Sequence, residues 1–460
     1  MTGYRDRIAA ALADGWRFAG LHATDGGGAV LVLLARADGS TLLERAAVEE
    51  GLAPTIVDIV PAAQWDEREA HDLHGVRFDG HEPLRPLADH DLDLASWTVP
   101  VRGRDAYQVA VGPIHAGVIE SGHFRFHVVG ERILHLDARL FYKYRGLERA
   151  AEGATLAEGL SYVRRACAAC SVANAVAYAH ACEEALGLDA PAGLARARTL
   201  LLELERLWNH LNDVGAVCAG TGLAAGTARF AGLTERCRRL NGALTGHRFL
   251  SGSVALGGSA LELDADAARA AREEVAAIAD DAKRGWRELL FNASFQDRLP
   301  EIGVLTRADA ERLGTVGPAA RASGVAEDLR TAGARLAYDG FSPAAPRRVA
   351  GDVQARLEQR AVELTQTFAL LDGLLDGPLR SVAAVNGGVQ AQVGVGRVES
   401  ARGATTCVVE RGGDRIERLR LRTASYANWP SVAHAAVGDL LPDFPLINKS
   451  FELCYACVDR

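Results

Sequence analysis

Apolar residues recur at helical spacing over three long segments of the chain, residues 194–214, 266–290 and 352–371. Within the first segment, one stripe holds Leu200, Leu204, Leu207 and Leu211. Such a stripe is typical of a helix that buries one face in a core. The pattern therefore predicts long helices that dominate the second part of the chain.

Near the N-terminus the pattern changes to short apolar runs separated by turn residues. After an expected N-terminal helix, apolar runs at residues 29–35 and 41–43 flank a turn at Asp38 and Gly39. Two β-type runs joined by a glycine-containing turn are the usual signature of a hairpin. We therefore expect residues 29–43 to form two antiparallel strands.

Two further elements are expected before residue 90. The β-branched run at residues 55–60, stopped by Pro61, predicts a strand, and the polar segment 65–74, ended by Gly75, predicts a short helix. Together with the hairpin they predict a small α/β domain over residues 1–90.

Proline-rich sequence with mixed charges follows, and we interpret residues 91–104 as a linker to a large domain over residues 105–460. Alternating runs at 124–129 and 132–137 predict a second hairpin, and glycine-rich alternating sequence between 382 and 422 predicts a few strands. The expected fold class is α+β and multidomain: a small α/β domain, then a mainly helical domain with short hairpins.

Composition narrows the possible partners. The 460 residues carry 51 Lys and Arg against 59 Asp and Glu, a net charge of −8, with no basic patch that would indicate nucleic acid or an anionic lipid surface. The sequence contains no apolar run of about 18 residues and no apolar secretory signal. We therefore expect a cytoplasmic protein that contacts a membrane only through partner subunits.

Two C-x-x-C pairs carry the chemistry: Cys167 and Cys170 form one, and Cys454 and Cys457 form the other, 284 positions further on. Each pair can offer two soft thiolate ligands to one metal ion. A structural zinc site, a chance occurrence and a buried metal centre built from distant elements are all open. Structural zinc sites usually draw both pairs from one compact module, so the separation favours the buried centre.

At this point the residues carry a resemblance. Arg165-Ala-Cys-Ala-Ala-Cys170 resembles the R-x-C-G-x-C motif of [NiFe]-hydrogenase large subunits, and Cys454-Tyr-Ala-Cys457-Val-Asp-Arg460 resembles their C-terminal motif. Residues 112–126, 316–324 and 424–430 are similar to group 4 enzymes, the formate hydrogenlyase type. Residues 68–81 resemble the 30 kDa subunit of complex I, which this branch carries in front of a 49 kDa-like domain.

The resemblance implies a metal centre at the four cysteines. Cys167, Cys170, Cys454 and Cys457 would hold nickel, and Cys170 and Cys457 would also bridge to an iron that carries CO and cyanide. It further implies a magnesium ion near the C-terminus, where Arg460 would orient neighbouring groups or the ion.

The residues expected to act in catalysis are Glu120, Arg402 and Cys454. Glu120 matches a carboxylate that passes protons toward the surface, and Arg402 matches an arginine that binds beside the iron. A thiolate such as Cys454, next to a redox-active metal, is a suitable proton acceptor.

Several positions depart from the family pattern. Ala168 replaces a glycine, Asn174 a histidine, and Glu452-Leu453 an Asp-Pro pair, while Ala401 and Ala404 flank the arginine in place of Pro and Glu. Such neighbours orient ligands and tune a metal. The family's C-terminal extension, which is removed during maturation, is expected either to be absent from this gene or to have been cleaved already.

We therefore interpret the chain as the catalytic subunit of a membrane-associated [NiFe]-hydrogenase, which reversibly reduces protons to H2, in a formate-linked complex by this resemblance. The partners implied are an Fe–S small subunit, integral membrane subunits of the complex I type, formate dehydrogenase and maturation proteins, on the inner face of the membrane. Two rivals are a non-catalytic coupling subunit with a structural thiol or zinc site, and a quinone-binding module.

Overall fold

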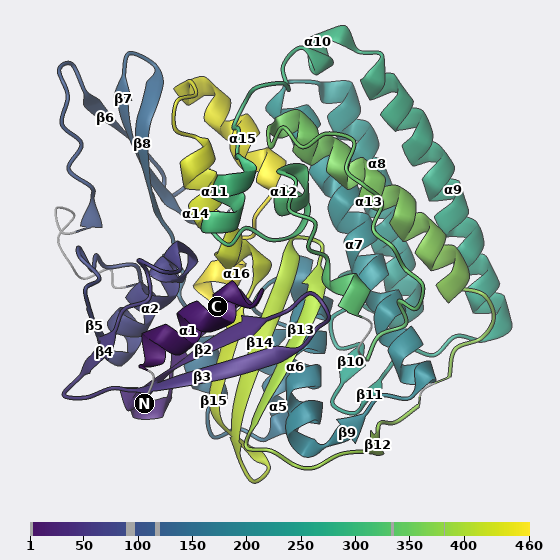
Figure 1. Cartoon of the computed structure of the whole chain (residues 1–460). Helices are drawn as coiled ribbons and strands as arrows, with labels where there is room; N and C mark the ends of the chain where they lie inside the picture. Colours follow the sequence, from purple (N-terminus) through teal and green to yellow (C-terminus); the bar gives the residue numbers. More distant parts are fainter. Residues whose placement is uncertain (1–2, 89–96, 116–119, 333–334, 381) are drawn as a thin grey trace.

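The computed structural model describes residues 3–88, 97–115, 120–332, 335–380 and 382–460. Figure 1 shows a small N-terminal unit beside a large unit, in which long helices and a three-stranded sheet are separate layers. This mixed, multidomain architecture confirms the predicted α+β fold class. Of the predicted linker, residues 91–96 lie outside the described ranges, so the domain limits stay a prediction.

The N-terminal unit is built on the antiparallel sheet β1-β2-β3. Its elements are α1 (Tyr4–Ala13), β1 (Arg17–Ala23), η1 (Asp25–Gly27), β2 (Ala29–Ala35), β3 (Thr41–Ala47), β4 (Leu52–Pro54), η2 (Pro61–Ala63), α2 (Gln64–His74) and β5 (Arg77–Asp79). The β2–β3 hairpin confirms the prediction from the apolar runs, and Gly39 supplies the positive φ of 89° that its turn needs.

The prediction of a strand at residues 55–60 is wrong. The strand in this part of the chain is β4, which ends before Thr55 and pairs in parallel with β5. Residues 55–60 form a turn because the buried carboxylate of Glu67 accepts hydrogen bonds from the Thr55 hydroxyl (2.7 Å) and the Ile56 amide (2.8 Å). A tertiary contact therefore overrides the β propensity of this segment.

The large unit begins with the antiparallel sheet β6-β7-β8, whose last two strands confirm the second hairpin. Its elements up to the helical layer are β6 (Tyr107–Val111), β7 (His123–Val129), β8 (Arg132–Arg139), α4 (Leu147–Ala151), α5 (Leu156–Val163), η3 (Ala168–Cys170), α6 (Ser171–Leu186) and β9 (Leu188–Asp189).

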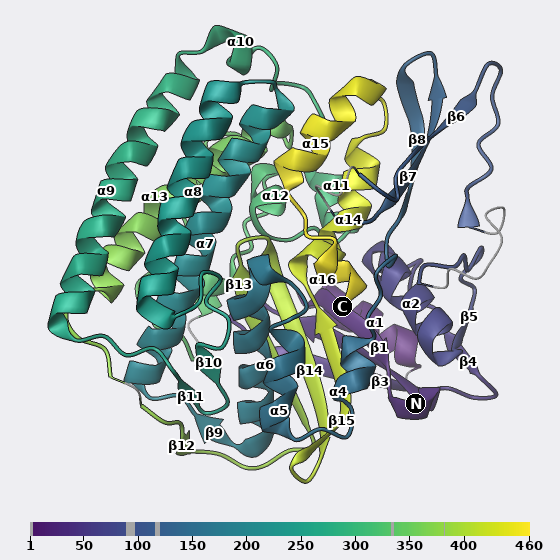
Figure 2. The ribbon, with the colours of Figure 1, turned by 180° about the vertical axis from the view of Figure 1, so that it is seen from behind.

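Four long helices form the helical layer, seen from behind in Figure 2. They are α7 (Ala192–Gly220), α8 (Ala224–Thr245), α9 (Ala265–Leu290) and α13 (Val353–Leu374), joined by β10 (Val254–Ala255), β11 (Gly258–Ser259), α10 (Ala293–Gln296), α11 (Arg307–Arg312), α12 (Gly317–Ala322) and η4 (Leu329–Ala332). Three of the four coincide with the predicted apolar periodicities. The apolar stripe of α7 lies in the largest core, which confirms that these helices form it.

A second layer is the antiparallel sheet β13-β14-β15. The C-terminal elements are β12 (Val385–Asn386), β13 (Val393–Ser400), β14 (Gly403–Gly412), β15 (Arg415–Arg422), α14 (Ala424–Ala435), η5 (Leu441–Asp443), α15 (Phe444–Phe451) and α16 (Ala456–Asp459). Helix α6 packs so closely on β13 that a Cβ at Gly396 would lie 1.8 Å from the Ala177 carbonyl oxygen. Glycine is therefore required there.

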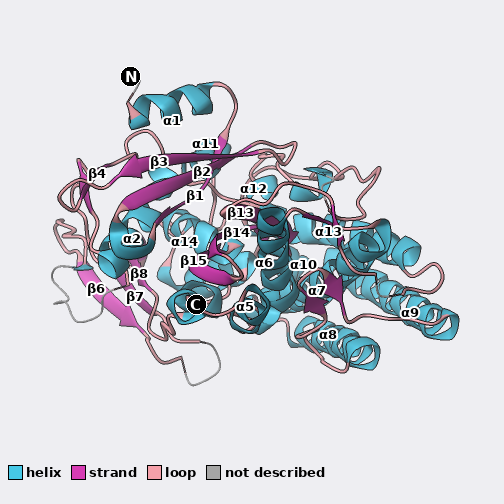
Figure 3. Ribbon diagram, turned by 90° about the horizontal axis from the view of Figure 1, so that it is seen from below, coloured by secondary structure: helices cyan, strands magenta, loops and turns pink. Residues whose placement is uncertain are grey.

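The N-terminal sheet stacks on the opposite face of this second sheet (Figure 3). Ala19, Leu33, Ala35 and Val408 form a small apolar cluster between the two sheets. The short polar helix α2 is also buried in this interface, which its sequence did not indicate. Asp66 is 1% exposed and Glu69 is 3% exposed.

Ion pairs explain why a polar helix can be buried here. Asp66 accepts hydrogen bonds from Arg420 (3.2 Å), Arg422 (3.1 Å) and the Leu21 amide (3.2 Å), and Glu69 pairs with Arg420 and Arg460. Buried charges are tolerated only when they are paired and hydrogen-bonded. The N-terminal unit is thus joined to β15 and to the C-terminal segment by charge.

Replacing Asp66 by Ala should destabilise the protein by about 3 to 5 kcal/mol, because it leaves the buried guanidinium of Arg422 without its carboxylate and removes one of the partners of Arg420. Guanidinium denaturation followed by circular dichroism measures the loss. Asp58→Ala is the matched control, since Asp58 is exposed and pairs with Arg5 at the surface. Equal destabilisation by both variants would contradict a structural role for the buried pairs.

Candidate metal centre

The structure brings the two C-x-x-C pairs to one point. The sulfur atoms of Cys167, Cys170, Cys454 and Cys457, hereafter the four-cysteine cluster, all lie within 4.8 Å of one another. Cys170 and Cys454, 284 positions apart, have their sulfurs 4.0 Å apart. Within the described ranges this is the one group of three or more His, Cys, Asp or Glu side chains whose ligand atoms converge.

Local structure presents the first pair from the start of a helix. Cys170 ends η3 and directly precedes α6. The first amides of α6 are satisfied by Glu205 of α7, whose carboxylate accepts from Val172 (2.7 Å) and Ala173 (3.0 Å). Because Glu205 is 2% exposed, burial raises its pKa to about 8. This carboxylate fixes the helix end that carries the first pair.

The second pair is presented by a turn and a short helix. Glu452 ends α15 in the left-handed conformation (φ 50°) and turns the chain back toward Cys454, and Cys457 lies in α16. The Cys454 amide donates to the Ser425 hydroxyl (3.0 Å), and the Thr423 hydroxyl donates to the Cys457 carbonyl (3.1 Å). Both partners belong to the start of α14, which therefore positions the second pair.

Arg145 joins the two cysteine-bearing segments directly. Its guanidinium donates to the carbonyl oxygens of Arg165 (3.0 Å) and Ala166 (2.7 Å), next to the first pair. It also donates to the carbonyl of Ala456 (2.9 Å), between the residues of the second pair. One side chain thus sets the distance between the two segments.

The four thiols influence one another's protonation. Hydrogen bonds from Cys167, Cys170 and Cys457 hold the pKa of Cys454 well below its usual value, and the positive charge of Arg402 acts in the same direction. The same network raises the pKa of Cys170 well above its usual value. Cys454 therefore ionises more readily than Cys170, and a metal would have to displace the proton of the Cys170 thiol.

Arg402 lines the same cavity as Cys167 and Cys454 of the four-cysteine cluster. The side chain is buried, and its guanidinium donates to Asp213 (2.5 Å) and to the Asn209 amide oxygen (3.2 Å). Asn209 in turn donates to the Ala169 carbonyl (2.9 Å), between the first two cysteines. Arg402 Nε has no partner among the described residues, which leaves one donor free at the site.

Glu120 reaches the second pair through the backbone. Its carboxylate accepts a hydrogen bond of 2.5 Å from the Ala456 amide, between Cys454 and Cys457. The residue as a whole is exposed, yet partial burial of its carboxyl raises its pKa. Glu120 is thus placed between the cysteines and the surface.

A cavity of about 780 Å³ opens beside the four-cysteine cluster. Its walls include Glu120, Cys167, Trp208, Arg238, Phe249, Arg402, Glu452, Cys454 and Tyr455. The sulfurs are therefore not sealed inside the core, and small molecules can approach from this cavity.

The departures from the family pattern differ in their consequences. Ala168 lies in η3 and has no positive φ, so the missing glycine causes no backbone strain. Leu453 is buried in the aromatic cluster beneath the site. Asn174 is fully buried, and neither atom of its amide group has a partner among the described residues. This unsatisfied amide, one turn after Cys170, is what a bound group would be expected to engage.

Three further residues of this site, Glu205, Asn209 and Asp213, belong to no motif recognised in the sequence. They recur every four residues along α7 and so share one face of it. The signal for them in the sequence is a polar stripe within a helix that also carries a long apolar stripe. Asp213 is fully buried, and its pKa is lowered to about 2, because Arg402 and Arg360 outweigh the effect of burial.

The predicted magnesium ion does not fit the residues near the C-terminus. Glu69 and Glu148, two buried carboxylates near the C-terminus, both pair with the guanidinium of Arg460, and Glu148 also accepts the Leu421 amide (2.7 Å). Arg418 and Arg420 lie close to Glu148 as well. Carboxylates already neutralised by arginines do not attract a further cation, and the guanidinium groups around them would repel it, so these two carboxylates hold Arg460 rather than magnesium.

Comparisons with known proteins agree with this geometry. The family model of the respiratory-chain NADH dehydrogenase 49 kDa subunit matches residues 222–381 and 382–460, and that of the 30 kDa subunit matches residues 16–103. Formate hydrogenlyase subunit 5 of Escherichia coli (strain K12) is 31% identical over 88% of this chain and 77% of that protein. Hydrogenase-4 component G of the same organism is 29% identical over 88% and 76%.

A solved structure is also similar. A chain of the membrane-bound sulfane sulfur reductase, an archaeal respiratory membrane complex, superimposes with a TM-score of 0.70 at 27% identity, covering 77% of this chain and 99% of that chain. The chain therefore belongs to the family that includes the complex I 49 kDa subunit and the large subunits of membrane-bound hydrogenases, with a 30 kDa-like segment in front. In the described parts of the chain, no helix is long and apolar enough to cross a membrane.

If Arg460 takes the place of a magnesium ion, millimolar Mg²⁺ should leave the thermal unfolding midpoint unchanged relative to NaCl of the same ionic strength. A site filled at 100 times its Kd would instead stabilise the fold by about 2.7 kcal/mol. Scanning calorimetry with and without EDTA makes the comparison. A midpoint that rises with Mg²⁺ and falls with EDTA would contradict the assignment.

Proposed function

We propose that this chain is the catalytic subunit of a membrane-associated [NiFe]-hydrogenase, which reversibly reduces protons to H2. The single observation that carries the proposal is the convergence of four cysteine sulfurs, from segments 284 positions apart, beside a buried arginine. Two further observations support the proposal: the chain belongs to a family that includes hydrogenases, and an accessible cavity lies beside the sulfurs.

The residues present fit a soft metal centre. Four thiolates bind nickel and iron well, and the free Nε of Arg402 and the unsatisfied Asn174 amide are available to a bound group. Cys167, Cys170, Cys454 and Cys457 would hold nickel, with Cys170 and Cys457 also holding an iron that carries CO and cyanide. When bound, the metal pair would supply the redox chemistry of 2H⁺ + 2e⁻ ⇌ H2.

Arg402 would balance charge and hold small ligands. Four thiolates concentrate negative charge at one buried point, and a guanidinium beside them offsets part of it. Because Asp213 and Asn209 fix its terminal nitrogens, Nε keeps one orientation and can donate to a cyanide nitrogen.

Protons would move between the sulfurs and the surface through Cys454 and Glu120. The lowered pKa of Cys454 keeps this sulfur in the thiolate form, which can take up a proton and release it again. The Glu120 carboxyl has a raised pKa, accepts a hydrogen bond from the Ala456 amide between Cys454 and Cys457, and belongs to an exposed residue. A carboxyl placed in this way can exchange protons with water.

Electrons would come from a partner. In the described parts of the chain, no second group of metal-ligating side chains converges, so we propose an Fe–S small subunit as the electron carrier. Relatives belong to membrane-bound complexes, and we propose integral membrane subunits, formate dehydrogenase and maturation proteins as further partners, with the chain held peripherally on the inner membrane face.

Replacing Cys454 by Ser should remove nickel and iron together and abolish H2/D⁺ exchange, because one thiolate of four is lost and the others cannot hold both metals. Cys237→Ser is the matched control, since Cys237 is a buried cysteine on α8 that does not belong to the four-cysteine cluster. Metal analysis and gas mass spectrometry give the two readouts. Full metal content in Cys454→Ser would show that the thiols are not the ligands.

Glu120→Gln should retain the metals but slow H2/D⁺ exchange by about 100-fold or more, since an amide cannot carry a proton. Glu273→Gln, an exposed site on α9, controls for loss of surface charge. An unchanged exchange rate in Glu120→Gln, with metals present, would remove this residue from the proton path.

A further inference from the structure

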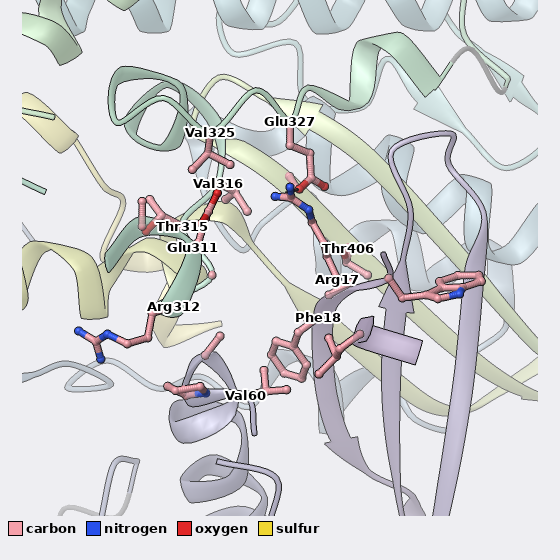
Figure 4. A pocket seen from close by; sticks show the side chains of 18 of the residues that line it. Arg17, Phe18, Val60, Glu311, Arg312, Thr315, Val316, Val325, Glu327 and Thr406 are labelled. Carbon is pink, nitrogen blue, oxygen red and sulfur yellow. Dashed lines mark hydrogen bonds and ion pairs between the residues drawn. The ribbon is translucent and has the colours of Figure 1, made fainter. Parts of the chain in front are cut away.

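A second cavity, of about 490 Å³, lies between the N-terminal unit and the large unit, apart from the four-cysteine cluster. Figure 4 looks into it: Arg17, Glu327 and Thr406 lie on one side, and Glu311 and Thr315 lie on the other. Its walls come from β1, η2, α11, the loop before α12 and the sheet β13-β14-β15. Both units therefore contribute to it.

Its floor is a row of three polar residues across the sheet. Arg397 of β13 is paired with Thr406 of β14, and Thr406 is paired with Arg422 of β15. Directly paired residues in neighbouring strands point to the same face. The register thus places two guanidinium groups on either side of one hydroxyl, all on the face that the cavity covers.

Arg397 is the unusual member of this row. Its side chain is 10% exposed, and its nearest carboxylate, on Glu327, is 3.7 Å away and is shared with Arg17 at 3.4 Å. Nε and Nη1 of Arg397 are buried and have no hydrogen-bond partner among the described residues. Burial, together with the nearby charge of Arg422, lowers the pKa of Arg397.

Other buried arginines leave at most one buried guanidinium nitrogen without a partner among the described residues. Arg321, for example, donates to Glu363 at 2.8 Å and to Glu399 at 2.9 Å. An unpaired buried charge costs several kcal/mol in general, so a guanidinium with two unused donors is the exception. Something other than the protein's own groups is expected to satisfy it.

The remaining walls favour an anion over a cation. Arg422 uses Nε for Asp66 and lies over the Phe18 ring at 5.3 Å, while Arg17 stands half-exposed at the rim. Of the two acidic residues, Glu311 is paired with Arg307, and Glu327 already faces two arginines. Positive charge therefore exceeds negative charge around the row.

We propose that this cavity binds a small oxyanion, a phosphate or carboxylate group of a small molecule, held by Arg397, Thr406 and Arg422. Guanidinium forks match such groups with two parallel hydrogen bonds, and a threonine hydroxyl adds a third donor. The aromatic and aliphatic walls at Trp16, Phe18 and Val60 would contact the rest of that molecule. Because both units line the cavity, a bound molecule would also stabilise the contact between the N-terminal unit and the large unit.

Thermal unfolding of the full chain in inorganic phosphate and in malonate tests the proposal, with NaCl of equal ionic strength as reference. Either oxyanion should raise the midpoint with a saturable concentration dependence, and isothermal calorimetry should give one site. The anion that stabilises the fold more strongly shows whether the cavity prefers a phosphoryl or a carboxylate group. No stabilisation beyond NaCl by either would overturn the proposal.

Arg397→Met should weaken binding at least 10-fold while leaving the midpoint in NaCl unchanged or higher, because it removes a poorly paired buried charge. Arg312→Gln is the matched control: it lines the same cavity but pairs with Asp309, and binding should change less than twofold. Arg17→Gln at the rim provides a second, better tolerated variant and should weaken binding several-fold. Unaltered binding in Arg397→Met, or equal weakening in Arg312→Gln, would contradict the assignment.

Discussion

Holding four sulfurs from two distant segments at one buried point is the constraint on which the rest of this structure depends. The cysteine-bearing segments are short and have no core of their own. Polar contacts to their backbone therefore position them: Arg145 holds both segments, Glu205 and Asn209 hold the first, and Ser425 and Thr423 hold the second. Four of these partners lie on α7 or at the start of α14, which pack in the main cores, whereas Arg145 lies in the loop before α4.

The same constraint explains the amount of buried charge. Arg402 beside the sulfurs is fixed by Asp213, and Arg460 at the end of the second segment is fixed by Glu69 of α2 and by Glu148. The N-terminal unit is therefore linked ionically to the segment that carries Cys454 and Cys457. Such pairs add little net stability, but they disfavour alternative arrangements of the chain, because each alternative would leave a buried charge without a partner.

Sequence patterns predicted the fold where local signals agreed with tertiary structure. The long helices and both hairpins followed from apolar periodicity and turn residues, and the cysteine spacing indicated the four-cysteine cluster. The strand predicted at 55–60 does not form because the Glu67 carboxylate accepts hydrogen bonds from the Thr55 hydroxyl and the Ile56 amide. The burial of α2, the role of Asp213 and the pairing of Arg460 with Glu69 depend on partners hundreds of residues distant, which no local pattern encodes.

The central claim is that the four-cysteine cluster holds nickel and an iron with diatomic ligands. Metal analysis of the natively expressed protein, combined with its infrared spectrum in the CO and cyanide region, tests this most directly. Our account predicts nickel and iron in equal amounts, together with diatomic stretching bands. Stoichiometric zinc and an empty infrared window would contradict it and would favour a structural thiol site in a coupling subunit.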